Sequence, residues 1–153
     1  MVQHISDLVG RELKWSKPHW LKMEYELQDE ETRVGTLRFR SSLGTLATGE
    51  IGEGCWTFKR AGFLQTRATI RRCGEDQDLA VFKNNSWTGG GTLELPDGRR
   101  YPANTNFCMT SYEFRSEAGE SLVKFRRIGG IVHLSSVVEI QPAATARATQ
   151  CIE

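Results

Sequence analysis

Residues 63–82, FLQTRATIRRCGEDQDLAVF, are the clearest of three copies of one sequence unit. Each copy begins with an aromatic residue, alternates between apolar and polar side chains, passes through a short polar turn and closes on a run that ends in Phe. This pattern predicts a β-hairpin. The other two copies are 20–39, WLKMEYELQDEETRVGTLRF, and 107–125, FCMTSYEFRSEAGESLVKF.

The copies begin at residues 20, 63 and 107, which gives a nearly constant period. A period of this size indicates a repeated supersecondary unit that cannot bury its apolar face alone. The segments between the copies also have the pattern of strand pairs, and Asp97-Gly98 is a strong hairpin signal. Each module therefore supplies about four strands, so we expect an all-β protein of about twelve strands in a closed antiparallel barrel, because closure removes exposed edges.

The alternation predicts which side chains face the interior. In the first strands of the three copies these are Leu21, Met23, Tyr25 and Leu27, then Leu64, Thr66, Ala68 and Ile70, then Cys108, Thr110, Tyr112 and Phe114. We expect an N-terminal extension at 1–19 with a short helical turn around Ser6 to Leu13, the barrel domain at 20–141 and a tail at 142–153.

The composition is that of a single domain without a strong overall field. The 153 residues carry 20 Lys and Arg against 19 Asp and Glu, so charge does not commit the chain to nucleic acid or to an anionic membrane. No window has the roughly 20 apolar residues that a membrane span needs. With no secretory signal pattern and no C-x-x-C spacing, we expect reduced thiols in a cytoplasmic protein at Cys55, Cys73, Cys108 and Cys151.

No catalytic or metal-binding constellation stands out. The histidines His4, His19 and His133 lack the spacing of a metal site. Cys73 is the best candidate nucleophile, because Arg71 and Arg72 could lower its thiol pKa, but an ordinary cysteine at a hairpin end is the favoured interpretation. Cys55 and Cys108 are expected to be small core residues. We therefore expect a non-enzymatic protein without a metal or cofactor.

Four basic doublets are the most suggestive feature for binding. Each lies at or near the end of an expected strand, and strand ends can gather on one rim of a barrel, where they could bind lipid headgroups. A simpler interpretation is that charged strand ends keep the protein soluble and block edge pairing. Nucleic acid is disfavoured because Trp56 and Phe58 alternate into the expected core and offer no stacking platform. The doublets are Lys59-Arg60, Arg71-Arg72, Arg99-Arg100 and Arg126-Arg127.

Three segments carry a resemblance to a known superfamily. They are GCWTFKRAGFLQTRATIRR at 54–72, DLAVFKNNSWTGGGTLELPDGRRY at 78–101 and YEFRSEAGESLVKFRR at 112–127. The chain resembles bacterial members of the tubby-like superfamily, which groups tubby C-terminal domains, phospholipid scramblases and LURP-one-related proteins. The resemblance implies a twelve-stranded barrel around a central apolar helix near the C-terminus. It also implies phospholipid binding, although no residue matches the tubby headgroup site.

The tail departs from that pattern. Residues 142–153, PAATARATQCIE, favour a helix but have almost no apolar face, so the central helix is expected to be missing or altered. A β-trefoil is the alternative fold. The function expected is a binding or scaffold module that binds anionic phospholipid peripherally through a basic rim. The alternatives are a carrier of an apolar ligand inside the barrel, and an assembly protein completed by a partner chain.

Overall fold

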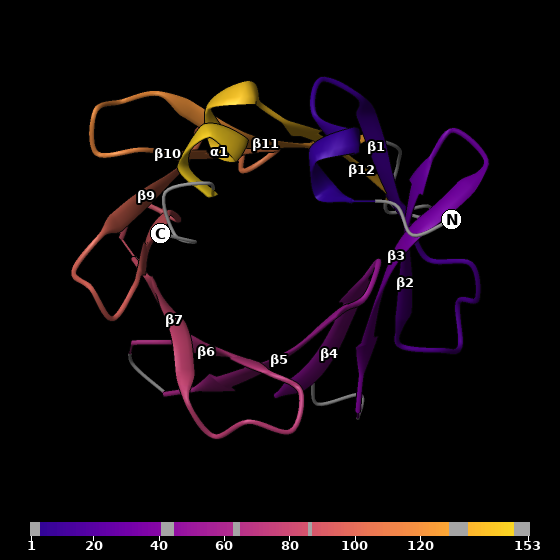
Figure 1. Cartoon of the computed structure of the whole chain (residues 1–153), viewed down its shortest axis with the longest axis horizontal. Helices are drawn as coiled ribbons and strands as arrows, with labels where there is room; N and C mark the ends of the chain where they lie inside the picture. Colours follow the sequence, from indigo (N-terminus) through magenta and orange to yellow (C-terminus); the bar gives the residue numbers. More distant parts are fainter. Residues whose placement is uncertain (1–3, 41–44, 63–64, 86, 129–134, 149–153) are drawn as a thin grey trace.

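Twelve antiparallel strands close into a single barrel in which sequence neighbours pair and β1 pairs with β12 (Figure 1). The computed structural model describes residues 4–40, 45–62, 65–85, 87–128 and 135–148. The strands are β1 (Glu12–Ser16), β2 (Glu24–Asp29), β3 (Thr32–Phe39), β4 (Leu46–Ile51), β5 (Gly54–Ala61), β6 (Arg67–Arg72), β7 (Asp78–Asn84), β8 (Gly91–Glu94), β9 (Arg100–Thr105), β10 (Ser111–Arg115), β11 (Ser121–Ile128) and β12 (Ser135–Ile140). A 3-10 helix η1 (Ile5–Leu8) precedes them, and a helix α1 (Pro142–Ala148) follows.

The threefold repeat predicted from the sequence is confirmed in the register of the strands. Each of the three expected hairpins forms, as β2–β3, β6–β7 and β10–β11. Each hairpin also shifts register at the equivalent point, which is Leu27/Gln28 in the first, Ile70/Arg71 in the second and Phe114/Arg115 in the third. Because all twelve strands belong to one ring, the β-trefoil alternative is wrong.

The N-terminal segment belongs to the barrel and is not an extension. β1 lies within residues 1–19 and closes the ring between β12 and β2, with Leu13 opposite Val138. The expected helical turn is shorter than predicted and forms as η1, after which the Gly10 amide donates to the Ile140 carbonyl at 3.0 Å. The barrel domain therefore begins before residue 20.

The hairpin strands start later than the aromatic residues that mark the copies. β2 begins at Glu24 and β10 at Ser111, so Leu21, Cys108 and Thr110 are exposed instead of interior. Leu64 lies outside the described residues. Met23 and Thr66 are half-buried and lie just before β2 and β6. The other expected positions keep their side, because all of them have registers on the inward face: Tyr25, Leu27, Ala68, Ile70, Tyr112 and Phe114.

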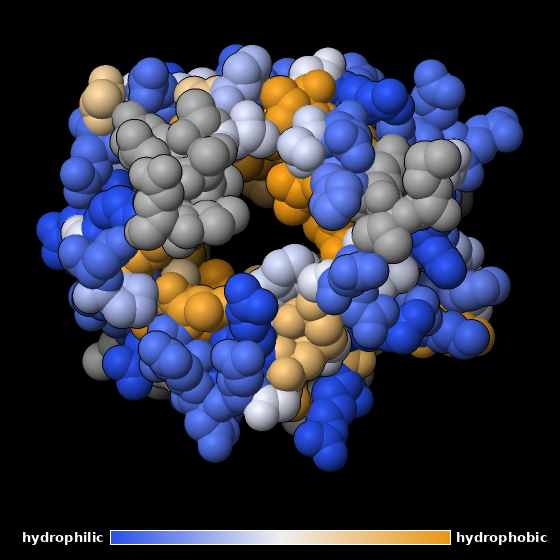
Figure 2. Space-filling view, in the orientation of Figure 1, coloured by the Kyte–Doolittle hydropathy of each residue, from blue (hydrophilic) through white to orange (hydrophobic). Residues whose placement is uncertain are grey.

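The inward face is packed on one side and open on the other. The buried cluster of Leu8, Leu13, Leu27, Val34 and Val138 lies around β12, β1, β2 and β3. On the opposite wall, inward residues such as Phe58, Ile70 and Leu93 are only half-buried. Figure 2 shows why: the centre of the ring is a hollow with hydrophobic side chains on its walls. A twelve-stranded barrel is too wide for its walls alone to fill.

Inward glycines keep aromatic rings against the wall. A Cβ atom at Gly49 would lie 2.9 Å from Cε2 of Phe58, and one at Gly91 would overlap the ring of Phe82. Each ring therefore covers the glycine of a neighbouring strand, an arrangement known from curved sheets. Rings packed against glycines in this way shield the backbone of the wall.

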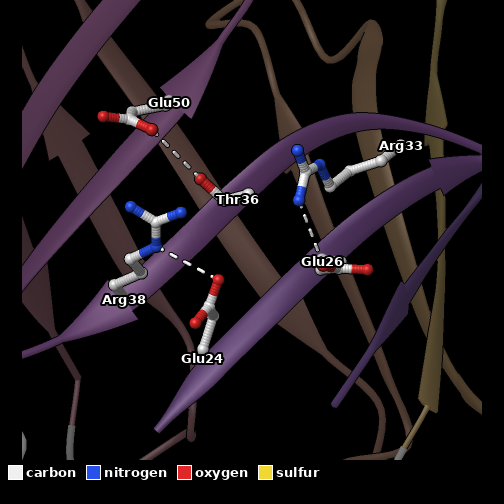
Figure 3. A network of polar contacts seen from close by, with 6 residues as sticks. All are labelled: Glu24, Glu26, Arg33, Thr36, Arg38 and Glu50. Atoms are coloured by element: carbon white, nitrogen blue, oxygen red, sulfur yellow. Dashed lines mark hydrogen bonds and ion pairs between the residues drawn. The ribbon is translucent and has the colours of Figure 1, made fainter. Parts of the chain in front are cut away.

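The outward face is covered by polar side chains that pair across neighbouring strands. On β2, β3 and β4, the guanidinium of Arg38 lies 3.1 Å from Glu24 and that of Arg33 lies 3.4 Å from Glu26 (Figure 3). Thr36 donates to Glu50 at 3.4 Å. Exposed pairs of this kind contribute little stability, about 0 to 1 kcal/mol each. They confirm the alternation that separates the wet face from the apolar one.

Cys55 and Cys73 form a disulfide, which corrects the expectation of reduced thiols. Cys55 has an outward register opposite Glu50, so it is not a core residue, and Cys73 is not a nucleophile in this state. Cys108 is free but exposed, so it is not a core residue either. Cys151 lies outside the described residues. Disulfides persist in oxidising compartments, so this pair argues against the expected cytoplasmic location, which stays a prediction.

The core can be tested with a matched pair of leucines. Leu13 is fully buried, so Leu13→Ala should lower the free energy of unfolding by about 2 to 5 kcal/mol in urea titrations. Leu21→Ala removes the same atoms from an exposed side chain and should change it by less than about 0.5 kcal/mol. Equal effects of the two substitutions would contradict the assigned register.

The disulfide can be detected by thiol titration, and its contribution to stability can then be measured. Thiol titration of the denatured protein should find two fewer free thiols before reduction than after it, because one disulfide joins Cys55 and Cys73. Reduction should lower the free energy of unfolding by about 2 to 4 kcal/mol, since the bridge restricts the unfolded chain. Cys108→Ser is the control and should alter neither the thiol difference nor the stability change. An unchanged thiol count on reduction would rule out the bridge.

Candidate functional site: the basic rim

The antiparallel closure gives the barrel two chemically different ends. Odd-numbered strands finish at one end, which we call the basic rim, and even-numbered strands finish at the other, the acidic rim. Most of the acidic residues in the chain lie at the acidic rim, in its connections or at the strand ends that flank them. They are Asp7, Glu12, Asp29, Glu30, Glu31, Glu53, Glu75, Asp76, Asp78, Glu94, Asp97, Glu117 and Glu120.

The cations of the acidic rim are largely neutralised by these carboxylates. Arg11 pairs with Asp29, and Arg99 lies 2.6 Å from Asp97. Hydrogen bonds from Lys83 and Arg99 hold the pKa values of Glu94 and Asp97, respectively, below their usual range. These two carboxylates therefore stay ionised at neutral pH, and the acidic rim is negative overall.

The basic rim has the opposite character. Within the described part of the chain, Glu24 is the acidic residue of this rim, and its partner is Arg38. Lys83, which is opposite Arg67 in the register, also lies at this rim and pairs with Glu94 at 2.7 Å. Six other cations there have no carboxylate of a described residue within ion-pair distance, although Lys17 contacts the Tyr25 ring, with Nζ 5.9 Å from its centre. These cations are Lys17, Lys22, Arg40, Arg60, Arg67 and Arg127.

The four basic doublets predicted from the sequence do not gather on one rim. Lys59-Arg60 and Arg126-Arg127 lie toward the basic rim on β5 and β11. Arg71-Arg72 and Arg99-Arg100 lie at the acidic rim, where Arg71 pairs with Asp78 at 2.6 Å and Arg100 with Glu94 at 3.2 Å. Within a doublet on a strand, the two side chains also have registers on opposite faces. Only half of the predicted set therefore contributes to the basic rim.

Large apolar side chains stand exposed on the same rim. Trp20 and Leu21 lie in the β1–β2 connection, and Trp87 lies in the β7–β8 connection. Phe107 and Met109 lie in the β9–β10 connection, and Trp87 and Phe107 are essentially fully exposed. Scattered exposed apolar residues are ordinary on proteins, but these five lie on one end among cations that have no described carboxylate partner, which indicates an interaction surface.

The β9–β10 connection is held in place by its own hydrogen bonds. The Asn106 side-chain oxygen accepts from the amides of Thr110 at 2.8 Å and Ser111 at 3.1 Å, and its side-chain amide donates to the Thr110 hydroxyl at 2.7 Å. Met109 has a positive φ of 51°, which costs energy for a residue with a Cβ. The loop thus holds the exposed side chains of Phe107 and Met109 in a defined and strained conformation.

The β7–β8 connection is built in a similar way and lies beside it. Asn85 accepts from the Trp87 amide at 3.1 Å through its side chain and from the Gly89 amide at 3.0 Å through its carbonyl. A Cβ atom at Gly89 would lie 3.4 Å from Sδ of Met109, so the two loops are in contact. Trp87, Phe107 and Met109 therefore belong to neighbouring loops of one surface.

A pocket of about 290 Å³ lies inside the basic rim, which we call the rim pocket. Its walls include the aromatic side chains of Trp15, Tyr25, Tyr112 and Phe125, and Arg127 is its charged residue. Burial raises the pKa of Tyr112, whose hydroxyl donates to the Gly89 carbonyl at 3.0 Å. The pocket is thus mainly apolar and contains one cation, and the hydrogen bond of Tyr112 joins its wall to the β7–β8 connection.

Other kinds of site find no support in the described ranges. There, no group of three or more His, Cys, Asp or Glu side chains is placed to hold a metal ion. Likewise, no helix in these ranges is long and apolar enough to cross a membrane.

Most cations of the basic rim are single residues in the sequence, whereas the predicted set consisted of doublets. Lys17, Lys22, Arg40 and Arg67 stand alone in the sequence, but each lies in or beside a connection between expected modules or strand pairs. Assigning alternate connections to opposite ends of an antiparallel barrel would have separated the acidic turns from these cations. That signal was available once the strand count was fixed.

Comparison with known proteins supports the fold alone. No protein-family model matches the sequence, and no curated protein has a significantly similar sequence. A solved X-ray structure of a protein from Arabidopsis thaliana is similar, with a TM-score of 0.60 over 99% of this chain and 95% of that chain. The identity is 12%, so this likeness bears on the barrel architecture and not on function or on tubby-like membership.

Proposed function

We propose that this protein is a non-enzymatic, tubby-like module that binds anionic membrane surfaces peripherally through the basic rim. The observation that carries the proposal is that exposed apolar side chains and cations with no described carboxylate partner lie on the same end of the barrel. The sequence resemblance to tubby-like proteins supports the same class of ligand.

The two kinds of residue act on different layers of a membrane. Lys and Arg near an anionic leaflet each contribute about 1 kcal/mol of attraction, which salt screens. Trp and Phe favour the boundary between headgroups and acyl chains, where an apolar ring is taken out of water. Trp20, Trp87 and Phe107 are positioned to enter that boundary while Arg40, Arg60 and Arg67 contact phosphates.

The charge distribution also favours one orientation. A negative acidic rim is repelled by an anionic surface, whereas the basic rim is attracted to it. The near-zero net charge of +1 therefore hides a polar arrangement that would steer the barrel end-on toward a membrane. An assembly protein completed by a partner chain remains a second hypothesis, and it predicts an oligomer on size-exclusion chromatography where the membrane hypothesis requires none.

The electrostatic part can be tested with charge-matched variants. The double variant Arg60→Gln/Arg67→Gln should bind vesicles containing phosphatidylserine roughly 30-fold more weakly in cosedimentation at low salt, from about 1 kcal/mol per residue. The control Arg72→Gln/Lys124→Gln removes the same charge away from the basic rim and should bind like wild type. Equal losses in both variants would mean that net charge, and not the rim, controls binding.

The apolar part should persist when charge is screened. Trp87→Ala should weaken vesicle binding roughly tenfold even at high salt. The fully exposed indole of the wild type is transferred from water into the membrane on binding, and the variant loses this favourable contribution. Ile5→Ala removes an exposed apolar side chain next to the acidic rim and serves as the control. A blue shift of tryptophan fluorescence on vesicle addition should shrink in Trp87→Ala. An unchanged shift and affinity would remove this side chain from the docking surface.

A further inference from the structure

The rim pocket combines an apolar wall with one cation in a way that suits a specific kind of ligand. Trp15, Ser136 and Arg127 lie side by side on the inward face of β1, β12 and β11, since Ser136 is the register partner of both. We infer that the rim pocket binds a single-chain anionic amphiphile such as a fatty acid, with the carboxylate at Arg127 and the chain directed into the hollow.

Arg127 is suited to hold the carboxylate. The residues that line the rim pocket include no Asp or Glu, and no carboxylate of a described residue forms an ion pair with this guanidinium. A guanidinium can bind a carboxylate through two parallel hydrogen bonds. Ser136, which is opposite Arg127 on the inward face, also lines the pocket, and its hydroxyl offers a further donor. The polar end of the pocket is therefore matched to an anion.

The apolar end continues into the barrel. The ring of Phe125 lies 6.2 Å from that of Phe114, which in turn lies 5.9 Å from that of Phe82, measured between ring centres. These rings form a continuous aromatic surface from the rim pocket on β11 toward β7. A volume of about 290 Å³ is at the lower end of that of ligand sites, so a long chain would extend along this surface into the hollow shown in Figure 2.

This inference deepens the proposed function, because the rim pocket lies within the proposed docking surface, but binding of a dissolved amphiphile does not require a membrane. The two ideas can therefore fail separately. Loss of vesicle binding in the Arg60 and Trp87 variants concerns docking, whereas binding of monomeric fatty acid concerns the rim pocket.

The first test uses the unmodified protein. Binding of cis-parinaric acid below its critical micelle concentration, followed by its fluorescence, should be saturable at one site and displaced by oleate. Oleyl alcohol, which has the same chain without the charge, should displace it at least tenfold less well, and inorganic phosphate should not displace it. Absence of saturable binding, or equal displacement by oleate and oleyl alcohol, would overturn the inference.

Adjacent arginines supply the matched variants. Arg127→Gln should weaken parinarate binding roughly 10- to 100-fold, the range for a lost hydrogen bond to a charged group. It should leave the affinity for oleyl alcohol unchanged. Arg126→Gln changes the neighbouring residue, whose register is on the outward face opposite Val137, and should bind parinarate like wild type. Equal effects of the two substitutions would overturn the assignment of the carboxylate to the rim pocket.

Discussion

Closure of twelve strands into one ring is the constraint on which the rest of this structure depends. A ring of this size removes every sheet edge, but it encloses more space than its own inward side chains can fill. The protein packs one side, where Leu8 from η1 supplements Leu13 and Leu27. On the wall from β5 to β9, larger inward side chains such as Phe58, Ile70 and Leu93 are only half-buried. Phe58 and Phe82 pack against glycines of neighbouring strands, so these rings cover the wall of the barrel.

The same closure also separates the acidic residues from the basic ones, by placing them at opposite ends of the barrel. Because consecutive connections alternate between the two ends, a sequence in which acidic turns alternate with basic connections folds into a barrel with one negative and one positive end. Glu30, Glu75 and Glu117 fall in equivalent turns of the three modules, and all of them reach the acidic rim. Because the acidic turn is repeated in three modules, the three turns together make one end of the barrel negative and produce an electric field along the barrel.

The fold was predictable from the sequence, whereas the candidate site was only partly so. Alternation at Tyr25, Ile70 and Phe114 gave the repeat, the hairpins and the strand count, because period-two burial is a local property. The predicted strands began too early because Trp20, Leu21 and Phe107 are apolar and stand next to strands. Their solvent exposure depends on the tertiary structure, which the local pattern does not contain. The pairing of Cys55 with Cys73 depends on two strand ends meeting in space, which spacing alone does not encode.

One exposed side chain of the basic rim, Met109, connects the docking surface with the rim pocket. Met109 lines the rim pocket and belongs to the strained loop that holds the exposed side chain of Phe107, so one loop serves both the surface and the cavity. A barrel docked by its basic rim would place the mouth of the pocket at the membrane interface. An amphiphile could then pass between bilayer and hollow without exposing its chain to water, which would otherwise cost about 0.8 kcal/mol per CH₂ group.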